Sequence, residues 1–287
     1  MRARLVVMAL VAVITVTGFA IGGDTSPHPE WVTRGRITIE GDADFTPQNG
    51  VVGGSGTKAD PYRIEGWFID IDSDPRRYAI SIANTSAHVS VSGNGFYVSN
   101  PSSFDTVGVQ LTGVSNVLVR GNHFGTSYIR FAVRVEGSEG VQVDANNFVC
   151  NEVYIRKSNR VVVAGNLSCV NGIAASDTSN LTIRDNTIRA WGFPGYGVSM
   201  WGVRNALVAG NTIQVAREAR ALELWGGKNV TVRGNQVTLY DPSDTTGFTY
   251  GMTLEASESI HVEDNVVLGI RQGPSIEVKS SKGIALF

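Results

Sequence analysis

The sequence has few of the residues that build metal and disulfide sites. Its 287 residues include two cysteines, four histidines and four methionines. The histidines (His28, His88, His123 and His261) are scattered along the chain, so no cluster predicts a copper site, and we expect neither a metal nor a cofactor. Lys and Arg total 24 against 26 Asp and Glu, without a basic patch. This balance argues against nucleic acid as a partner.

Long apolar runs are absent after the N-terminus, so only that end is expected to meet a membrane. Two arginines precede a mostly apolar run that reaches Ile21. This order is typical of an export signal, and Gly18 and Ala20 offer a small-residue cleavage site. The alternative is an uncleaved membrane anchor, because the run is near the lower limit for a span. We predict a signal peptide or anchor over residues 1–23 and an extracytoplasmic location.

The chain is instead rich in glycine and in an internal repeat. Three copies read GVQLTGVSNVLVRGNHF (108–124), AVRVEGSEGVQVDANNF (132–148) and ALELWGGKNVTVRGNQV (221–237). Apolar and polar residues alternate in each copy, which predicts short strands with one buried face. One copy cannot bury that face, but copies stacked about 4.8 Å apart close a continuous core. The sequence therefore predicts an all-β fold, a right-handed parallel β-helix of about eight or nine coils with three short strands each.

An asparagine recurs late in every copy. Asn tolerates left-handed turns, and its amide both donates and accepts hydrogen bonds, so stacked copies predict an asparagine ladder. The predicted ladder contains Asn94, Asn122, Asn146, Asn166, Asn186, Asn211, Asn235 and Asn265. Five copies carry another asparagine six residues earlier: Asn116, Asn159, Asn180, Asn205 and Asn229.

The remaining segments divide the chain. We expect a linker over residues 24–36, an N-terminal cap or first coil over 37–78, and the repeats over 79–287, with the last coil incomplete. No residues resembling a C-terminal cap are visible, which predicts either a truncated sequence or end-to-end self-association at that coil.

The two cysteines lie at similar places in neighbouring copies. Cys150 follows its ladder asparagine by four residues, and Cys169 follows the next by three. In an exported protein this placement predicts a disulfide between adjacent coils.

The stretch GSGTKADPYRIEGW at residues 54–67, together with the repeats that follow it, resembles exported archaeal β-helix proteins. These belong to the broad carbohydrate-binding and sugar-hydrolase β-helix group, which includes NosD-type periplasmic proteins linked to copper delivery. The resemblance covers about residues 37–287 and implies the fold. Fold similarity alone does not transfer a function.

Insertions between coils mark a predicted binding edge, because loops on one face of a repeat protein often form its site. The longer ones span 99–107, 191–196 and 240–250. Aromatic residues in and beside them are our candidates for stacking a polysaccharide or cell-envelope glycan: Trp191, Tyr196, Trp201, Trp225, Tyr240 and Tyr250. Outward positions nearby carry Arg134 and Tyr154. Simple packing between neighbouring strands explains the Trp201 and Trp225 pair equally well.

Evidence for catalysis is weaker. Glycoside hydrolysis needs two carboxylates about 5–9.5 Å apart, and Glu223 and Glu255 are the candidate pair. The polygalacturonase signatures NTD, DD, GHG and RIK are absent, as is an acidic cluster resembling a pectate-lyase calcium site. We therefore expect a non-catalytic binding or envelope-interaction role. The alternatives are a polysaccharide lyase or hydrolase, and a NosD-type metal-delivery accessory protein.

Overall fold

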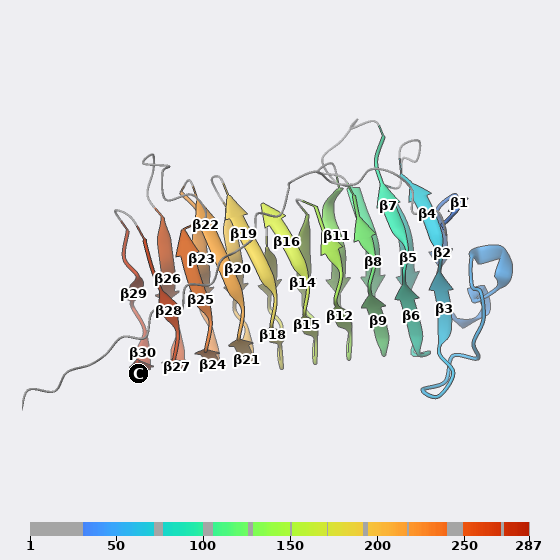
Figure 1. The fold of residues 1–287 in the computed structure, drawn as a ribbon. Coiled ribbons are helices and arrows are strands. Elements are labelled where there is room, and N and C mark those ends of the chain that lie inside the picture. Colours follow the sequence, from blue (N-terminus) through green and yellow to red (C-terminus); the bar gives the residue numbers. More distant parts are fainter. Residues whose placement is uncertain are drawn as a thin grey trace, which may run out of the picture.

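A computed structural model describes residues 31–71, 77–99, 106–125, 129–149, 151–170, 172–191, 195–216, 218–239, 249–270 and 273–286. These residues form a β-solenoid whose coils each contribute one strand to three parallel sheets (Figure 1). Each sheet has ten strands among the described residues. The three-stranded coils and parallel stacking predicted from the repeat are confirmed. Apart from two single-turn 3-10 helices, Asp42–Asp44 and Pro47–Asn49, the described elements are strands.

The three sheets take every third strand in chain order. Sheet A contains β1 (Val32–Arg34), β4 (Trp67–Asp70), β7 (Gly95–Tyr97), β10 (His123–Phe124), β13 (Asn147–Phe148), β16 (Leu167–Val170), β19 (Thr187–Trp191), β22 (Thr212–Ala216), β25 (Gln236–Leu239) and β28 (Val266–Val267). Sheet B contains β2 (Ile37–Ile39), β5 (Tyr78–Ala83), β8 (Thr106–Thr112), β11 (Ile129–Glu136), β14 (Glu152–Arg156), β17 (Ile173–Ser176), β20 (Tyr196–Trp201), β23 (Arg220–Trp225), β26 (Tyr250–Glu255) and β29 (Ile276–Lys279). Sheet C contains β3 (Tyr62–Glu65), β6 (Val89–Ser92), β9 (Val117–Arg120), β12 (Gln142–Asp144), β15 (Val162–Ala164), β18 (Thr182–Arg184), β21 (Arg204–Ala209), β24 (Lys228–Arg233), β27 (Glu258–Glu263) and β30 (Lys282–Leu286).

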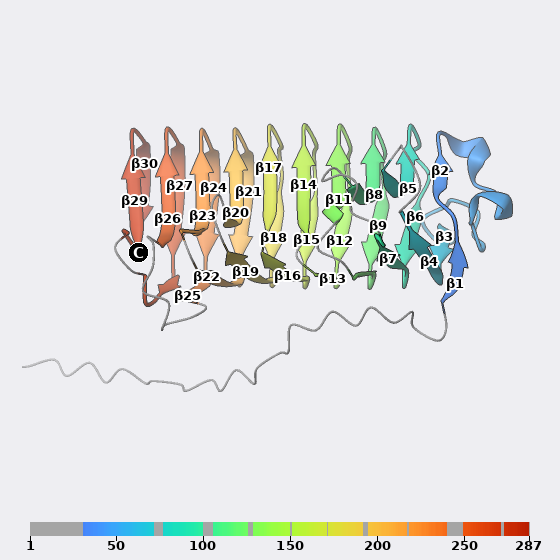
Figure 2. The same cartoon turned by 90° about the horizontal axis from the view of Figure 1, so that it is seen from above.

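The strands of successive coils stack side by side (Figure 2), and their register aligns equivalent residues. Val153 of β14 pairs with Ile173 of β17, which pairs with Val198 of β20, and all three are buried. Side chains alternate between the two faces of a strand, so one residue in two points into the solenoid. Phe96, Phe124 and Phe148 stack in this core with ring centroids 4.6 and 5.1 Å apart.

The predicted asparagine ladder is confirmed, and all its members except the last, Asn265, are buried. The Oδ1 atom of Asn166 accepts hydrogen bonds from the backbone N–H and the Nδ2 atom of Asn146, at 2.9 and 3.0 Å. The same two bonds link successive ladder asparagines from Asn94 to Asn265. Each Nδ2 atom also donates to a carbonyl of the preceding coil, as Asn166 does to Val143. The ladder thereby satisfies buried polar groups where the chain turns between sheets C and A.

Two further stacks lie at the turn between sheets B and C. The asparagines Asn159, Asn180, Asn205 and Asn229 bond amide to amide near the surface. Beneath them, hydroxyls replace amides: the backbone N–H groups of Ser138 and Ser158 donate to the side chains of Ser158 and Thr178. The hydroxyl stack was not predicted, because single serines between strands are also typical of ordinary turns.

The end of the segment expected to be a linker, residues 31–36, belongs to the fold. Strand β1 pairs with β4, and the Trp31 ring lies against sheet A, 5.9 Å from Phe68 and 6.2 Å from His123 between ring centroids. The predicted export signal falls on residues 1–23, outside the described part of the chain. Within the described part, no helix is long and apolar enough to cross a membrane.

Candidate functional site

The outer face of sheet B is hollowed over strand β17. Tyr154, Ala174, Ser199 and Glu223 form one row of outward side chains on four successive strands. On β17 the outward residues are small, Ala174 and Ser176, whereas Tyr154 rises on one side and Trp201 on the other. A strand with small side chains between strands with large ones leaves a groove.

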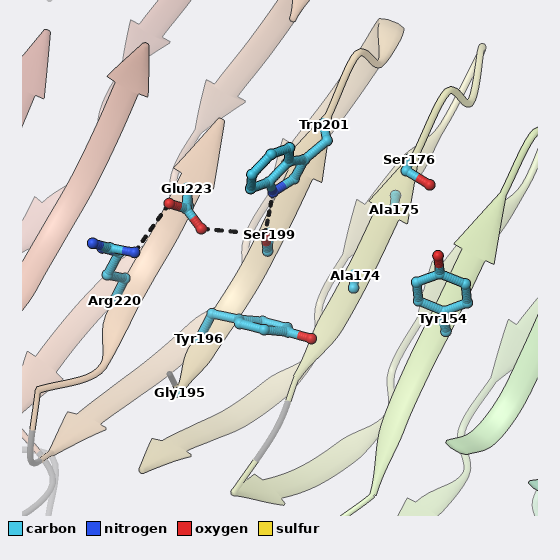
Figure 3. Close-up of a pocket in the computed structure, with 10 residues that line it drawn as sticks. All are labelled: Tyr154, Ala174, Ala175, Ser176, Gly195, Tyr196, Ser199, Trp201, Arg220 and Glu223. Carbon is cyan, nitrogen blue, oxygen red and sulfur yellow. Dashed lines mark hydrogen bonds and ion pairs between the residues drawn. The ribbon is translucent and has the colours of Figure 1, made fainter. Parts of the chain in front are cut away.

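This first compartment has a volume of about 560 Å³ (Figure 3). It is lined by Tyr154, Ala174, Ala175, Ser176, Gly195, Tyr196, Ser199, Trp201, Arg220 and Glu223. The Tyr196 ring points from β20 toward β17, below Ala174 in Figure 3. A single compartment thus combines aromatic walls with hydroxyl, carboxylate and guanidinium groups, the composition usual for sites of small ligands.

One wall of the compartment is held by a chain of polar contacts. The Trp201 indole N–H donates to Ser199 Oγ at 3.1 Å, and the Ser199 hydroxyl donates to Glu223 Oε2 at 3.4 Å. The other Glu223 oxygen accepts from Arg220 Nη1 at 3.1 Å. The Arg220 guanidinium lies 5.5 Å from the Tyr250 ring centroid. Because both oxygens of Glu223 are engaged, this carboxylate fixes the orientation of Trp201 and Arg220.

A second compartment of about 400 Å³ adjoins the first. It is lined by Arg130, Phe131, Arg134, Glu152, Tyr154 and Tyr196. Since Tyr154 and Tyr196 line both compartments, the two form one groove that runs along the solenoid axis over β20, β17, β14 and β11.

Glu152 is the buried acid of this groove, with 6% of its surface exposed. Loss of hydration raises the pKa of its carboxyl, while a hydrogen bond with Tyr196 and the positive charge of Arg130 act in the opposite direction. Burial also raises the pKa of the Tyr196 phenol, with a further increase from the nearby Glu152 charge. Tyr196 therefore remains a protonated donor at ordinary pH.

The contact between Tyr196 and Glu152 spans two strand spacings. Val153 aligns with Ile173, so Gly172 occupies the place beside Glu152 on the next coil. A Cβ atom at Gly172 would collide with the carbonyl oxygen of Gly197. Glycine here keeps the coils in register and leaves no side chain between Tyr196 and Glu152.

The structure separates the six aromatic candidates. Tyr196 and Trp201 line the first compartment. Trp225 packs on Trp201 with ring centroids 5.3 Å apart, and Tyr250 contacts Arg220, but neither lines either of these two compartments. Trp191 lies at the end of β19 in sheet A, where its backbone pairs with Ala216. Tyr240 lies outside the described residues.

The two candidate carboxylates occupy different outward rows. Glu223 aligns with Thr253, whereas Glu255 aligns with Trp225 and Lys279. Only Glu223 lines the groove.

Ala174, Glu152 and Arg130 are among the lining residues that the sequence analysis did not select. A signal for Ala174 exists: it is the smallest member of the row twelve residues before the ladder asparagine, where other copies carry Arg134, Tyr154 and Glu223.

The predicted disulfide falls partly outside the described structure. Cys150 is not among the described residues, so the Cys150–Cys169 bond stays a prediction. Within the described residues, no three His, Cys, Asp or Glu side chains gather in a way that would hold a metal ion.

Comparison with known families gives one match. The family model described as "Periplasmic copper-binding protein (NosD)" matches residues 87–243 and, in an overlapping second placement, residues 192–286. Together these placements cover more than half of the chain. Among curated proteins, no sequence matches this one significantly.

Solved structures with the same fold share little sequence with the chain. PfbA, a surface adhesin of Streptococcus pneumoniae, is 15% identical over 77% of this chain and 71% of its own, with a TM-score of 0.55. The Dettilon tailspike protein is 13% identical over 88% of this chain and 59% of its own, at 0.53. The C387A mutant of DFA-IIIase from Arthrobacter chlorophenolicus A6 is 13% identical over 76% and 71%, at 0.51. At these identities, the likeness concerns the fold.

Proposed function

Because the chain belongs to the NosD family of parallel β-helix proteins, we propose that it is a non-catalytic binding protein that acts outside the cytoplasm and holds a glycan in the groove of sheet B. The family description as periplasmic and the apolar run near the N-terminus support this location. The observation that carries the ligand class is the small floor of Ala174 and Ser176 between the rings of Tyr154, Tyr196 and Trp201.

Sugar rings have apolar faces and a rim of hydroxyl groups. Aromatic side chains offer flat apolar surfaces with polar edges, so a groove walled by them suits such a ligand. Ser176, Arg220 and the partly exposed Glu223 lie at the edges of the same compartment, where they can exchange hydrogen bonds with hydroxyl groups.

The placement of the carboxylates favours binding over hydrolysis. Glu152 and Glu223 lie on β14 and β23, three strand spacings apart, so their backbones are separated by about 14 Å. Glycosidase carboxylates are about 5–9.5 Å apart. Both Glu223 oxygens are already bonded within the protein.

Copper delivery, which the family description suggests, lacks a matching donor set in the described residues. No group of three candidate ligands occurs there, and Met200 and Met252 are buried in the core.

The test is a glycan array probed with the purified full-length chain and two variants. Ala174→Trp fills the groove floor on the outer face, where the core is not disturbed. Thr182→Trp places the same ring on the outer face of sheet C and is the matched control. We expect Ala174→Trp to abolish the binding that wild type and Thr182→Trp retain.

Single variants of the tryptophans separate stacking on a ligand from packing between strands. Trp201→Ala should weaken binding by about tenfold, which corresponds to about 1.4 kcal/mol. Trp225→Ala, which lines neither compartment, should cost less. A well-folded wild type that binds no glycan would refute the proposed function, and release of shorter sugars from a bound glycan would favour the hydrolase or lyase alternative.

A further inference from the structure

The groove of sheet B is longer than a single sugar unit. Its two compartments, of about 560 and 400 Å³, share the side chains of Tyr154 and Tyr196. Most of their lining residues lie on five successive strands of the sheet, from β11 to β23. With strands about 4.8 Å apart, the first and last of these strands are separated by roughly 19 Å along the solenoid axis. The groove therefore has room for several sugar units in a row.

Aromatic rings occur at several places along this length. Trp201 on β20 lines the first compartment, Tyr154 on β14 lines both, and Phe131 on β11 lines the second. The rings of Tyr154 and Phe131 are in contact, with centroids 5.4 Å apart, so the aromatic lining continues from one compartment into the next. Each ring offers a flat apolar surface. A ligand that contacts all three rings presents apolar faces at intervals along its own length.

The floor beneath the first compartment is straight. From β14 to β23 the strands pair without a register shift, so one outward row runs from Tyr154 through Ala174 to Glu223. Pyranose units with equatorial hydroxyl groups, joined by β-1,4 linkages, form an extended ribbon with apolar C–H faces, whereas α-1,4-linked chains coil. An extended chain can follow a straight floor across several strands, and a coiled chain leaves it after a short contact.

We propose that the groove holds an extended polysaccharide of β-1,4-linked pyranose units with equatorial hydroxyl groups, lying across the strands from β23 to β11. This inference rests on the proposed glycan-binding function and names the class of glycan. One unit advances such a chain by a length close to one strand spacing, so the four spacings between β11 and β23 correspond to about four bound units.

The test is a series of oligosaccharides of increasing length, titrated calorimetrically into the full-length chain. Cello- and chito-oligosaccharides, from the disaccharide to the hexasaccharide, provide the β-1,4 linkage. Malto-oligosaccharides of the same lengths contain the same glucose units as the cello series but have α-1,4 linkages. We expect the dissociation constant of at least one β-1,4 series to fall about tenfold from the disaccharide to the tetrasaccharide and then to level off, because added units gain aromatic contacts until the groove is full. The malto series should show no such gain.

A variant of the second compartment tests whether the longer chains reach it. Arg134 lines that compartment and not the first, so Arg134→Trp fills only the second. Gln110→Trp is the matched control, because Gln110 pairs with Arg134 in the same outward row on β8 and lines neither of the two compartments. We expect Arg134→Trp to bind the disaccharide as wild type does but to lose the gain with length, which Gln110→Trp should keep.

Several outcomes would overturn the proposal of an extended β-1,4-linked chain and leave the glycan-binding function intact. These are affinities that do not change with length, an equal gain in the malto series, and equal effects of Arg134→Trp and Gln110→Trp on the gain. Binding of glycans on the array without binding of either β-1,4 series would also overturn it. Failure of the folded protein to bind any glycan would instead refute the proposed function itself.

Discussion

At the scale of single residues, Glu152 should make stability depend on pH. Its pKa is raised in the folded protein by burial, so the native state binds more protons than the unfolded chain between the unfolded pKa, about 4.3, and the higher folded value. Unfolding free energy therefore falls as pH rises through that window and then levels off. Glu152→Gln should remove this fall and be more stable than wild type above the window.

Urea unfolding between about pH 4 and pH 8 measures this difference. Glu40→Gln, at an exposed position before the first 3-10 helix, is the control. It makes the same chemical change as Glu152→Gln, so it accounts for the effect that losing one carboxyl has on the unfolded chain. Profiles for wild type and Glu152→Gln that run parallel over the whole range would show that the carboxyl has no raised pKa in the folded protein.

The sequence could reveal part of the groove at this scale. The row containing Tyr154, Ala174 and Glu223 follows directly from the spacing to the ladder asparagines, including its small member. The contact between Tyr196 and Glu152 could not be predicted, because it depends on the direction of one ring across two coils. Trp191 and Trp201 are ten residues apart in the chain but lie on different sheets, so nearness in sequence does not place them on one face.

At the scale of structural elements, the buried and surface asparagine stacks should differ in their contribution to stability. Asn166→Ala leaves the backbone N–H and the Nδ2 atom of Asn146 without their acceptor. It also removes the hydrogen bond that Asn166 Nδ2 donates to Asn186 Oδ1. An unsatisfied buried polar group costs about 1–3 kcal/mol, so we expect a loss of roughly 2–5 kcal/mol in unfolding free energy. Chemical denaturation of purified variants measures it.

Asn159→Ala is the matched comparison from the surface stack. Its side-chain amide donates a hydrogen bond to Glu139 and accepts one from Asn180. Both bonds lie near solvent, where water can replace the two partners. The expected loss is below about 1 kcal/mol. Similar losses for the two variants would mean that the buried ladder contributes no more than an ordinary surface hydrogen bond.

At the scale of the whole molecule, the fold was predictable because one pattern is repeated until it encloses a core. Inward positions recur at fixed distances from each ladder asparagine, so Val163 and Ile183 could be aligned from sequence and do pair in the structure. The place of Trp31 and β1 in the fold was not predicted. That segment has no repeat pattern, and it is held by contacts of Trp31 with Phe68 and His123 from later coils.

The same architecture predicts that protection against hydrogen exchange falls toward the last described coil. In a solenoid each coil is stabilised mainly by its neighbours. Ile276 and Val278 align with the buried Met252 and Leu254, yet they are 36% and 42% exposed. We expect amides of residues 276–286 to exchange on the order of 100-fold faster than those of residues 173–190, equivalent to about 2.7 kcal/mol of local stability.

Exchange measured by mass spectrometry at several protein concentrations also tests the end-to-end self-association predicted from the sequence. If two copies stack through β28, β29 and β30, protection of residues 276–286 should rise with concentration while that of residues 173–190 stays constant. Constant fast exchange at this coil would argue against self-association through it. Strong protection that is already complete at the lowest concentration would contradict the expected gradient, because contacts within one chain would then suffice to stabilise the last coil.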